Sequence, residues 1–383
     1  MISAIDFRRH IHANPELSTV EKNTSEYVIT ELKKLGISKI HQGFSMHSIL
    51  AEIDGSESGP IILFRCELDA LPIQEDNDFL YRSTIEGVSH KCGHDGHAAT
   101  MFHFAQKLIE KPLKKGKILL FFQSAEEIGA GAKDAIESGI FEQFTIDYAF
   151  AFHNIPSFPL GTIMAKKGLF TPCVESGLFE LIGNTSHAAE PDKGINPALA
   201  ITEIINYFDV LKNSDKSSPD FFISTPIYIE MGEKSYGTSA GKASIGYTFR
   251  TWENDKFDAK KVEIEQRITE IAHKYHLETK SNWFETFNAN TNNVKAYSYI
   301  KSAAKIENFE VFELEKPFEF GEDFGLFTKK YKGAMFGIGS GVNQAPLHSS
   351  TFDFPDELLE IGAAMFYQIS EQILNSQQTP NLF

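Results

Sequence analysis

The chain has 383 residues, of which 42% are hydrophobic and 23% are charged. The composition is that of a globular protein with a large core and two or three domains, which excludes a disordered chain, a collagen and a small disulfide scaffold. Lysine and arginine number 36 against 52 aspartates and glutamates, a formal net charge of −16. A field of that sign repels phosphate backbones and anionic lipid, so we expect neither nucleic acid nor a membrane surface as a partner.

The termini and the cysteines indicate the compartment. No run approaches the roughly 18 apolar residues of a membrane helix, and the N-terminus becomes charged at Asp6 without an apolar stretch before it. Three cysteines, at positions 66, 92 and 173, form an odd and sparse set, which favours reduced thiols. We therefore expect a cytoplasmic protein without a signal peptide or a membrane span.

Predicted helices and short apolar strands alternate from the N-terminus to about residue 165. Hydrophobic periodicity predicts helices over 24–36, 98–110 and 131–139, and strands over 61–66, 118–122 and 147–153. Such alternation is typical of a mostly parallel sheet with helices on its faces.

The pattern changes after residue 171 and returns after residue 288. Between them the sequence predicts strands over 172–184, 221–230 and 243–251 and helices over 197–212 and 256–275. Beyond them it predicts a helix over 293–307, a strand over 334–338 and a long helix from about 356. We therefore predict an α/β domain formed by 1–171 and 288–383, with a mostly parallel mixed sheet, and an inserted smaller α+β domain over 172–287.

The densest cluster of chemically active residues is HKCGHDGH at 90–97. Thiolate, imidazole and carboxylate groups this close together are typical of metal ligands. The two glycines predict a tight loop between the strand at 61–66 and the helix at 98–110. For a lone cysteine or histidine a polar turn would be the simpler interpretation, but for this set we favour a metal site.

Carboxylates and histidines follow three other predicted strands. Glu126 and Glu127 come directly after the strand at 118–122, where open α/β sheets place their sites. Neighbouring side chains diverge in such a turn, so one carboxylate can hold a metal while the other faces a substrate. The alternative is two solvated glutamates. His153 and His348 follow the strands near 148–152 and 334–338, at the same expected edge.

A serine or cysteine hydrolase is the competing interpretation. The sequence holds no GxSxG motif, which a nucleophile elbow requires. Cys92 with a histidine would make a catalytic pair, but the carboxylate pair and the other histidines would then have no role. Neither standard glycine-rich phosphate loop is present.

Taken together, these residues resemble the aminoacylase/carboxypeptidase-type metallo-amidohydrolases, within the hippurate hydrolase and indole-acetyl-amino-acid hydrolase branch of the dinuclear zinc peptidases. The matching motifs run nearly from end to end, in the same order and spacing. They are RRHIH (8–12), NPEL (14–17), RCELDALP (65–72), CGHDGH (92–97), AEE (125–127), HN (153–154), SHAA (186–189), GEDF (321–324) and LHS (347–349).

The resemblance implies a site for two divalent metal ions, with zinc expected and manganese, cobalt or nickel as alternatives. It maps the metal ligands onto Cys92, His94, Glu127, His153 and His348. It implies that the Cys92 thiolate bridges the two ions. It also implies that Glu126 is the general base, which deprotonates a metal-activated water and returns the proton to the leaving amine.

The resemblance also implies that the inserted domain is a lid and dimerisation domain. His187 would reach the scissile carbonyl, in some dimeric relatives from the partner subunit, and Arg250 would bind a substrate carboxylate. The structural alternatives are a loop histidine and an ion pair. Asp69 would orient a ligating histidine. From the relatives we expect a homodimer through this domain.

Two segments depart from the family pattern. Cys66 and Glu67 replace the usual Ala-Asp, and YGTSAGK at 236–242 replaces an Asn-Val-Ile-Pro-like stretch near the substrate carbonyl and the subunit interface. Neither change touches the expected metal ligands. They leave the choice of substrate and the oligomeric contacts open.

The sequence therefore predicts a metal-dependent amidohydrolase that cleaves N-acyl or N-aroyl amino acids, or a similar small peptide-like substrate. One alternative is a metallocarboxypeptidase or dipeptidase of the same fold. Another is a catalytically inactive binding protein, against which the intact Glu126 and the five intact ligands argue.

Overall fold

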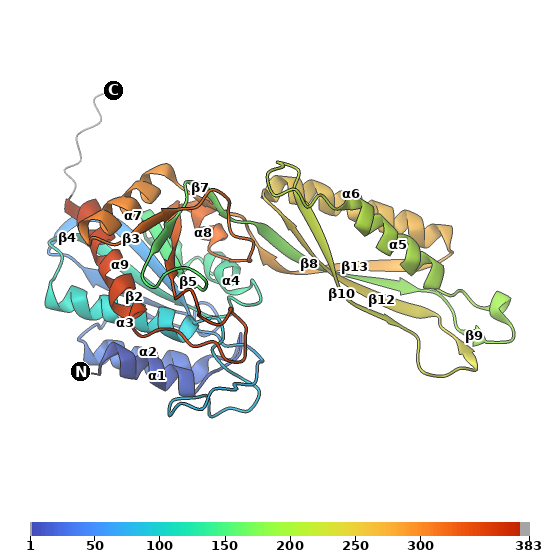
Figure 1. Ribbon diagram of the computed structural model, residues 1–383, viewed down its shortest axis with the longest axis horizontal. Coiled ribbons are helices and arrows are strands. Elements are labelled where there is room, and N and C mark those ends of the chain that lie inside the picture. The colour runs from blue at the N-terminus through green and yellow to red at the C-terminus, as the bar shows by residue number, and fades with distance from the viewer. Residues whose placement is uncertain (1, 376–383) are drawn as a thin grey trace, which may run out of the picture. The chain divides into compact units, whose positions relative to one another are not determined.

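The computed structural model describes residues 2–375, which form two compact units (Figure 1). The first unit contains the described residues up to 170, those at 290–317 and those from 322 onward. The second contains residues 171–289 and 318–321. Residues 318–321, which the sequence analysis places with the first domain, thus cluster with the inserted one.

An eight-stranded sheet organises the first unit, in the order β1-β2-β4-β3-β5-β16-β6-β15. The strands are β1 (Ile40–His41), β2 (Ile49–Asp54), β3 (Glu57–Glu67), β4 (Lys115–Gln123), β5 (Ile146–Ile155), β6 (Ile163–Ala165), β15 (Val311–Glu313) and β16 (Lys332–Gly339). The central strands β4, β3, β5 and β16 are parallel to one another, whereas β2 joins β4 and β6 joins β16 in antiparallel fashion. The carboxyl ends of the four central strands therefore meet at one edge of the sheet. Separately, β7 (Gly168–Thr171) pairs with β14 (Asn290–Asn292).

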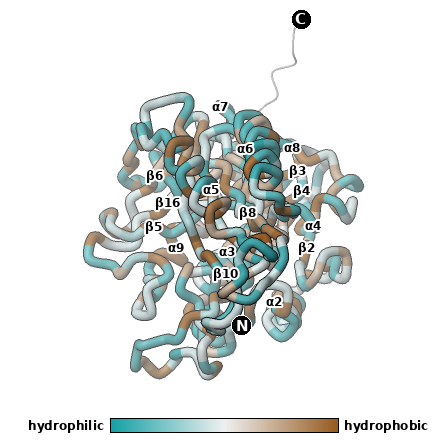
Figure 2. The backbone as a smooth tube through the Cα atoms, turned by 90° about the vertical axis from the view of Figure 1, so that its right-hand side faces the viewer, coloured by the Kyte–Doolittle hydropathy of each residue, from teal (hydrophilic) through white to brown (hydrophobic). Residues whose placement is uncertain are grey.

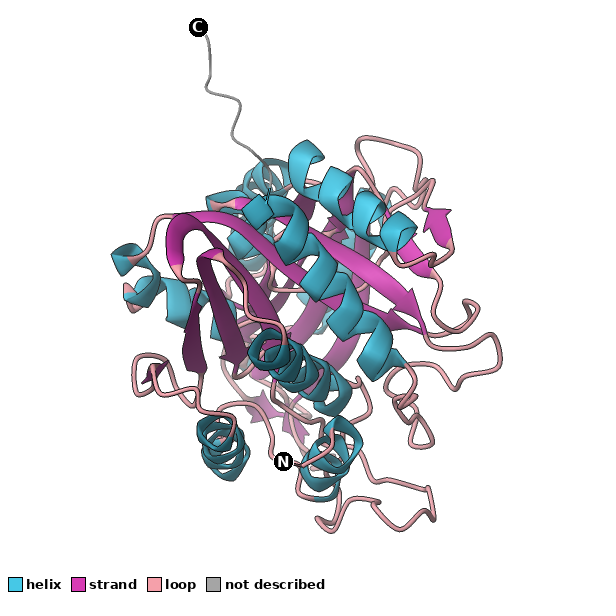
Figure 3. Ribbon diagram, turned by 90° about the vertical axis from the view of Figure 1, so that its left-hand side faces the viewer, coloured by secondary structure: helices cyan, strands magenta, loops and turns pink. Residues whose placement is uncertain are grey.

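Helices cover both faces of this sheet (Figure 3). They are α1 (Ala4–Ala13), α2 (Lys22–Lys34), α3 (His94–Glu110), α4 (Gly131–Glu137), α7 (Val294–Ile306), α8 (Gly325–Lys330) and α9 (Leu358–Asn375), with the short 3-10 turn η1 (Ile140–Gln143). The alternation of side chains along β4 shows why two apolar layers are needed. Leu120 and Phe122 belong to the core that α1, α2, α3, α7 and α9 cover, while Phe121 packs against Phe141 and Phe327 on the other face.

The second unit is a four-stranded antiparallel sheet with two long helices. The sheet order is β10-β12-β8-β13, and a small pair, β9 with β11, extends from it. The elements are β8 (Cys173–Ile182), β9 (Ser186–His187), η2 (Pro191–Lys193), α5 (Ala198–Leu211), β10 (Phe222–Met231), β11 (Thr238–Ser239), β12 (Lys242–Thr251), α6 (Asn254–Lys274) and β13 (Glu278–Phe287). Hydrophilic and hydrophobic residues alternate along α6 in Figure 2, and Ile264, Ile268 and Ile271 form its buried stripe.

The predicted fold class is confirmed: a mostly parallel mixed sheet flanked by helices, with an inserted α+β unit. Several element bounds differ from the prediction by a few residues, and strands β2 and β13 were not predicted. Helix α3 begins at His94 rather than at residue 98, and the sequence analysis missed α1 altogether. The cysteines are buried and unpaired. Among the described residues, no helix combines the length and the apolar character needed to cross a bilayer. The cytoplasmic location stays a prediction.

Candidate functional site

Cys92 and His94 lie at the start of α3, at the carboxyl edge of the sheet in the first unit. Gly93 between them is the N-cap of α3 and has a φ of +97°. A Cβ atom at Gly93 would lie 2.5 Å from Oδ1 of Asn154. Only glycine tolerates both the left-handed backbone and this approach. The sharp turn places the cysteine just before the helix and the histidine at its first residue.

The other predicted ligands come from strand ends and from the loop after β16. Glu127 follows β4, His153 lies on β5, and His348 adopts a φ of +64° in its loop. One ligand atom each of Cys92, His94 and His153 lie within 4.8 Å of one another. A second group within the same limit is Cys92, Glu127 and His348. The structure thus brings all five predicted ligands together, with the cysteine common to both groups.

The individual distances show how the side chains face each other. Cys92 Sγ lies 3.5 Å from His153 Nε2. Glu127 directs one oxygen to within 3.8 Å of His94 Nε2 and the other to within 3.8 Å of His348 Nε2. These separations exceed a hydrogen bond, so each carboxylate oxygen faces an imidazole nitrogen without bonding to it.

Two of these atoms are buried and have no partner. His94 Nε2 and Glu127 Oε1 are shielded from solvent and make no hydrogen bond. An unpaired buried polar atom is costly, and a native fold keeps one for a reason such as a bound ion. The donor set of sulfur, imidazole nitrogen and carboxylate oxygen is the set that zinc and related divalent ions prefer. The residues therefore fit a metal centre.

Hydrogen bonds on the far side of the His94 and His153 imidazoles fix their orientation. His94 Nδ1 lies 3.0 Å from the Asp69 carbonyl oxygen and 3.1 Å from Asp69 Oδ1. The second oxygen of Asp69 accepts from the Glu127 backbone N–H at 2.9 Å and from Ser18 Oγ at 2.8 Å. His153 Nδ1 faces the Asn154 carbonyl at 2.8 Å. Both rings thus present Nε2 to the centre, the usual arrangement of metal-ligating histidines.

Glu126, the predicted base, is buried at the margin of the same centre. Its Oε2 lies 3.8 Å from His94 Nε2. Burial, followed by the charges of Glu322, Asp323 and Glu127, raises the pKa of Glu126 well above its usual value. A carboxylate whose proton affinity is raised in this way suits general-base catalysis, because it retains the proton that it has accepted.

Sequence reasoning gave no role to a buried ionic network that joins the loops of the site. The Arg8 guanidinium contacts Asp95 at 3.0 Å, and His12 lies between Asp95 and Glu75, at 2.9 and 3.1 Å. Glu75 also pairs with Lys91, which is completely buried. The RRHIH motif at 8–12 was visible in the sequence, but charged residues are ordinarily expected at the surface.

Lys91 links the cysteine loop to the histidine loop. Its Nζ donates to the Phe352 carbonyl at 2.8 Å, and its own carbonyl accepts from the His348 N–H at 2.8 Å. The position of His348 therefore depends on the loop that carries Cys92. The sequence offered no sign of this contact, because 257 residues separate Lys91 from His348 in the printed numbering.

The two predicted substrate-binding residues belong to the second unit. His187 lies on β9, is exposed, and accepts a hydrogen bond at Nδ1 from the Ala189 N–H at 3.0 Å. Arg250 lies on β12, is half-buried, and forms none of the ion pairs found among the described residues. Burial lowers the pKa of Arg250, against the raising effect of Glu319. Their roles stay predictions.

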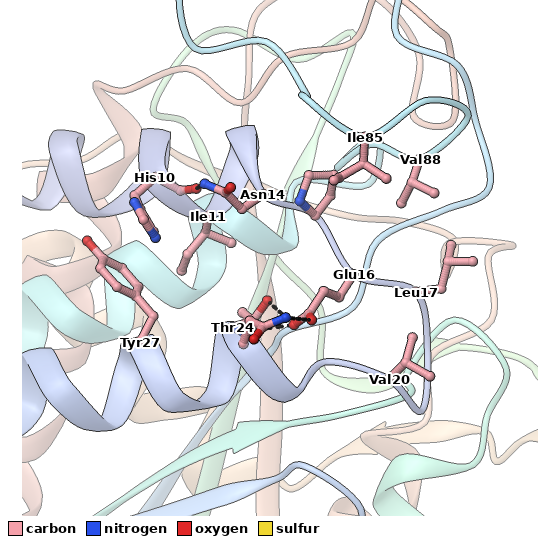
Figure 4. Close-up of a pocket in the computed structure, with 12 residues that line it drawn as sticks. His10, Ile11, Asn14, Glu16, Leu17, Val20, Thr24, Tyr27, Ile85 and Val88 are labelled. Atoms are coloured by element: carbon pink, nitrogen blue, oxygen red, sulfur yellow. Dashed lines mark hydrogen bonds between the residues drawn. The ribbon is translucent and has the colours of Figure 1, made fainter.

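A separate cavity of about 520 Å³ lies in the first unit (Figure 4). Its walls come from α1, α2, the segment 14–20 between them and the loop at 85–88, and most of the lining surface is apolar. Glu16 is the acid that lines it, and that carboxylate already accepts hydrogen bonds from the N–H and hydroxyl of Thr24, at 2.8 and 2.9 Å. The cavity includes none of the predicted ligands, so it is not the metal centre.

The chain is similar to several known proteins along nearly its whole length. Residues 63–372 match the profile of Peptidase family M20/M25/M40. The chain is 28% identical over 373 residues to the N-acetylcysteine deacetylase of Bacillus subtilis (strain 168), covering 97% of both chains. It is 31% identical over 371 residues to thermostable carboxypeptidase 1 of Saccharolobus solfataricus, covering 94% of this chain and 92% of that one.

A solved structure shares the whole fold. It is that of a Bacillus subtilis protein described as a dinuclear metal binding peptidase from the M20 family. The TM-score is 0.82 at 26% identity, and the alignment covers 98% of each chain. The resemblance drawn from the sequence motifs is thereby confirmed.

Proposed function

The chain belongs to peptidase family M20/M25/M40, and from that premise we propose that it hydrolyses the amide bond of N-acyl or N-aroyl amino acids with two bound divalent metal ions. The coarser activity, that of a hydrolase acting on amide bonds, follows from the family. The proposed substrate class is supported by the 28% identity to an N-acetylcysteine deacetylase along nearly the whole chain.

The observation that carries the proposal is the pair of unpartnered buried atoms, His94 Nε2 and Glu127 Oε1, within a ring of ligand-type side chains. Cys92, His94 and His153 would hold one ion, and Cys92, Glu127 and His348 the other. Zinc suits this donor set best, with manganese, cobalt or nickel as alternatives. The Bacillus subtilis protein of the same fold is described as binding a dinuclear metal centre.

When bound, two divalent cations lower the pKa of a water molecule to about 7 and polarise the amide carbonyl. Glu126 accepts the proton of the attacking water and delivers it to the amine nitrogen as the C–N bond breaks. The products are a carboxylate and a free amino acid, so atoms and charges balance. Asp69 and Asn154 keep the ring nitrogens of His94 and His153 directed at the centre throughout.

The second unit supplies the remaining groups of the proposal. It would act as a lid in which His187 approaches the scissile carbonyl, and Arg250 binds the carboxylate of the amino-acid portion. A half-buried guanidinium with none of the described ion pairs suits that role, since a carboxylate would satisfy its donors bidentately. We also propose a homodimer through this unit, because β10 and β13 are free edge strands of its sheet among the described residues.

A peptidase activity is the second candidate. The 31% identity to a thermostable carboxypeptidase favours it, and the same metal centre would serve peptide bonds. The two substrates differ in the group attached to the carbonyl, which is an acyl group in one case and an aminoacyl group in the other. A site for the aminoacyl substrate would need an acid near the free amine.

Elemental mass spectrometry and a hydrolysis panel test the proposal together. Protein purified without chelator should contain about two equivalents of divalent metal and lose its activity to a chelator. The panel should pair each N-acetyl or N-benzoyl amino acid with the dipeptide that has the same C-terminal residue. If the dipeptides were hydrolysed faster than the N-acyl amino acids, the chain would be assigned a peptidase activity instead. Metal without turnover of either set would leave an inactive binding protein.

A further inference from the structure

The turn that carries Glu126 and Glu127 has a strained backbone at the residue before them. Ala125, directly after β4, adopts a φ of +54° and is completely buried. The left-handed region is unfavourable for any residue with a Cβ atom, which then lies too close to a carbonyl oxygen. Such a conformation persists only where the surrounding structure holds it. The contacts that hold Ala125 therefore need an explanation.

The directions of two neighbouring carboxylates depend on this conformation. Oxygens of Glu126 lie within 4.8 Å of those of Glu322 and Asp323. Glu127 instead belongs to the group that contains the thiolate and one imidazole of the proposed metal centre. Because a change of φ at Ala125 would rotate the chain that follows it, both side chains would turn away from these partners.

Two neighbouring N–H groups of the turn donate to side chains from distant segments. The Ser124 N–H donates to Ser48 Oγ, just before β2, at 3.0 Å. The Ala125 N–H donates to Glu21 Oε1, at the start of α2, at 2.7 Å. A carboxyl oxygen accepts such a bond whether or not the group carries a proton. Glu21 therefore holds the strained residue directly.

Glu21 occupies the N-cap position of α2 but does not cap the helix. Its side chain makes no capping hydrogen bond. The Thr24 N–H, in the first turn of α2, donates instead to Glu16 Oε2 at 2.8 Å (Figure 4). A side chain at the N-cap ordinarily satisfies one of these first N–H groups. Here Glu16 does so, and the Glu21 carboxyl group is left for the turn after β4.

The burial of Glu21 is unfavourable by itself. The side chain is 0% exposed, and the charge of Asp69 acts on it. Burial beside a like charge is costly for a carboxyl group. The segment before Glu21 is also anchored: Ser18 Oγ donates to Asp69 Oδ2 at 2.8 Å, and Leu17 pairs with Ala70 in a short bridge. This anchored segment carries the carboxyl group to the strained turn.

We propose that Glu21 is a positioning residue, whose carboxyl oxygen holds the strained backbone at Ala125 and thereby directs Glu126 and Glu127 to their partners. Glu21 belongs to neither donor group of the proposed metal centre. The catalytic role of Glu126 rests on the proposed function. The hydrogen bond to Ala125 does not, and it can be measured without a substrate.

Hydrogen exchange of the full-length protein, as purified, tests the hydrogen bond. Glu21→Ala should raise the exchange rate of the Ala125 amide by about tenfold or more, as measured by mass spectrometry of peptides that contain it. Glu21→Gln keeps an acceptor oxygen and should exchange like wild type. Unchanged exchange in the alanine variant would overturn the proposal, whatever the substrate proves to be.

Kinetics with the same two variants test the positioning. Glu21→Ala should lower kcat by about tenfold or more and change KM by less than about twofold, because the base is displaced. Glu21→Gln should keep most of the wild-type kcat. If the glutamine variant is as slow as the alanine variant, the accepted hydrogen bond is not what matters and the proposal fails. If wild type itself turns over no substrate, the proposed function fails and the exchange experiment decides on Glu21.

Glu16→Ala separates positioning from a general effect on α2. It removes the carboxylate that accepts from the N–H and the hydroxyl of Thr24, so the melting temperature should fall. The turn after β4 keeps its contacts, and kcat should stay within about twofold of wild type. An equal loss of kcat in the Glu16 and Glu21 variants would assign the effect to α2, which contradicts the proposal.

The strain at Ala125 offers a rescue experiment. Glycine adopts a positive φ without the steric cost, so Ala125→Gly should reduce the need for Glu21. In that background Glu21→Ala should lower kcat by less than about threefold, against about tenfold or more in the wild-type background. A loss of the same size in both backgrounds would show that Glu21 does not act through the turn.

Discussion

Cys92 Sγ and His153 Nε2 lie 3.5 Å apart although 61 residues separate them in the chain. One stands at the start of α3 and the other near the carboxyl end of β5. They meet because β3 and β5 are neighbouring parallel strands, and parallel strands bring their carboxyl ends to the same edge of a sheet. Neighbouring strand ends thus bring together ligands from segments that are far apart in the chain.

Cys92 should decide how many ions the protein binds. It is the ligand-type residue common to both donor groups, so Cys92→Ala removes a ligand from each. We expect bound metal to fall from about two equivalents to less than about one, as measured by elemental mass spectrometry. Cys173→Ala, which changes a buried cysteine of the second unit, is the control and should keep its metal. If the Cys92→Ala variant kept its full metal content, the Cys92 thiolate would not be a metal ligand.

Glu126→Gln should strongly reduce turnover while the fold and the metal remain. The amide cannot accept a proton, so kcat should fall by about 10² to 10⁴. Metal content and melting temperature should match those of wild type. Glu137→Gln makes the same substitution at an exposed position on α4 and is the control, which should keep wild-type turnover. A Glu126 variant with wild-type turnover would show that another group is the base.

Arg250→Ala should weaken the binding of substrates that carry a free carboxylate. Loss of a charge-assisted hydrogen bond should raise KM about tenfold or more and leave kcat nearly unchanged. When the carboxylate of the substrate is converted to an amide, wild type and the Arg250→Ala variant should hydrolyse it with similar KM and kcat. Arg267→Ala is the matched control, since Arg267 pairs with Glu203 and Glu270 on the same unit. Equal effects on both substrates would assign Arg250 a structural role.

Protein stability should fall at alkaline pH through His12. Although burial alone would lower it, ionised Asp95 and Glu75 raise the pKa of His12 from 6.5 to about 9. A pKa raised by folding adds stability that is complete below pH 6.5 and is lost as the pH rises through about 9. The loss should be about 3 kcal/mol in chelator-treated protein, measured by denaturant unfolding at each pH.

His12→Gln should flatten this part of the stability profile, and His103→Gln, a change at the surface, should not. A wild-type profile with no decline between about pH 6.5 and 9 would show that the imidazolium makes no contribution.

Gly93→Ala should damage the centre, and Gly36→Ala provides a matched control. Both glycines have a positive φ, +97° and +89°, so both substitutions strain the backbone. Only at Gly93 would the new Cβ meet another residue, at 2.5 Å from Asn154 Oδ1, whereas nothing lies within 4 Å at Gly36. The strain alone should cost about 1 kcal/mol, and the clash should add to it. Equal melting temperatures for the two variants would show that the Asn154 side chain moves away from the new Cβ without a loss of stability.

The sequence could predict the fold because its evidence is local. Short apolar runs such as 61–66 and 118–122 mark buried parallel strands, and the ranges between them show helical periodicity. The start of α3 could not be placed, because the residues at 94–97 are polar and carry no apolar period. Helix α1 has an apolar stripe of Ala4, Phe7 and Ile11, but its buried face also includes Arg8 and His12, and charged residues are ordinarily expected at the surface.

By itself the sequence determined the kinds of chemical group available and the strand ends that carry them: one thiolate, three imidazoles and two carboxylates in four separate segments. Only the tertiary structure decided which atoms face one another, which of them lack a partner, and that Arg8, Lys91 and Glu322 are buried. The reason is physical. Residue type and periodicity follow from neighbours in the chain, whereas desolvation and pairing depend on groups that only the crossover connections of the sheet bring together.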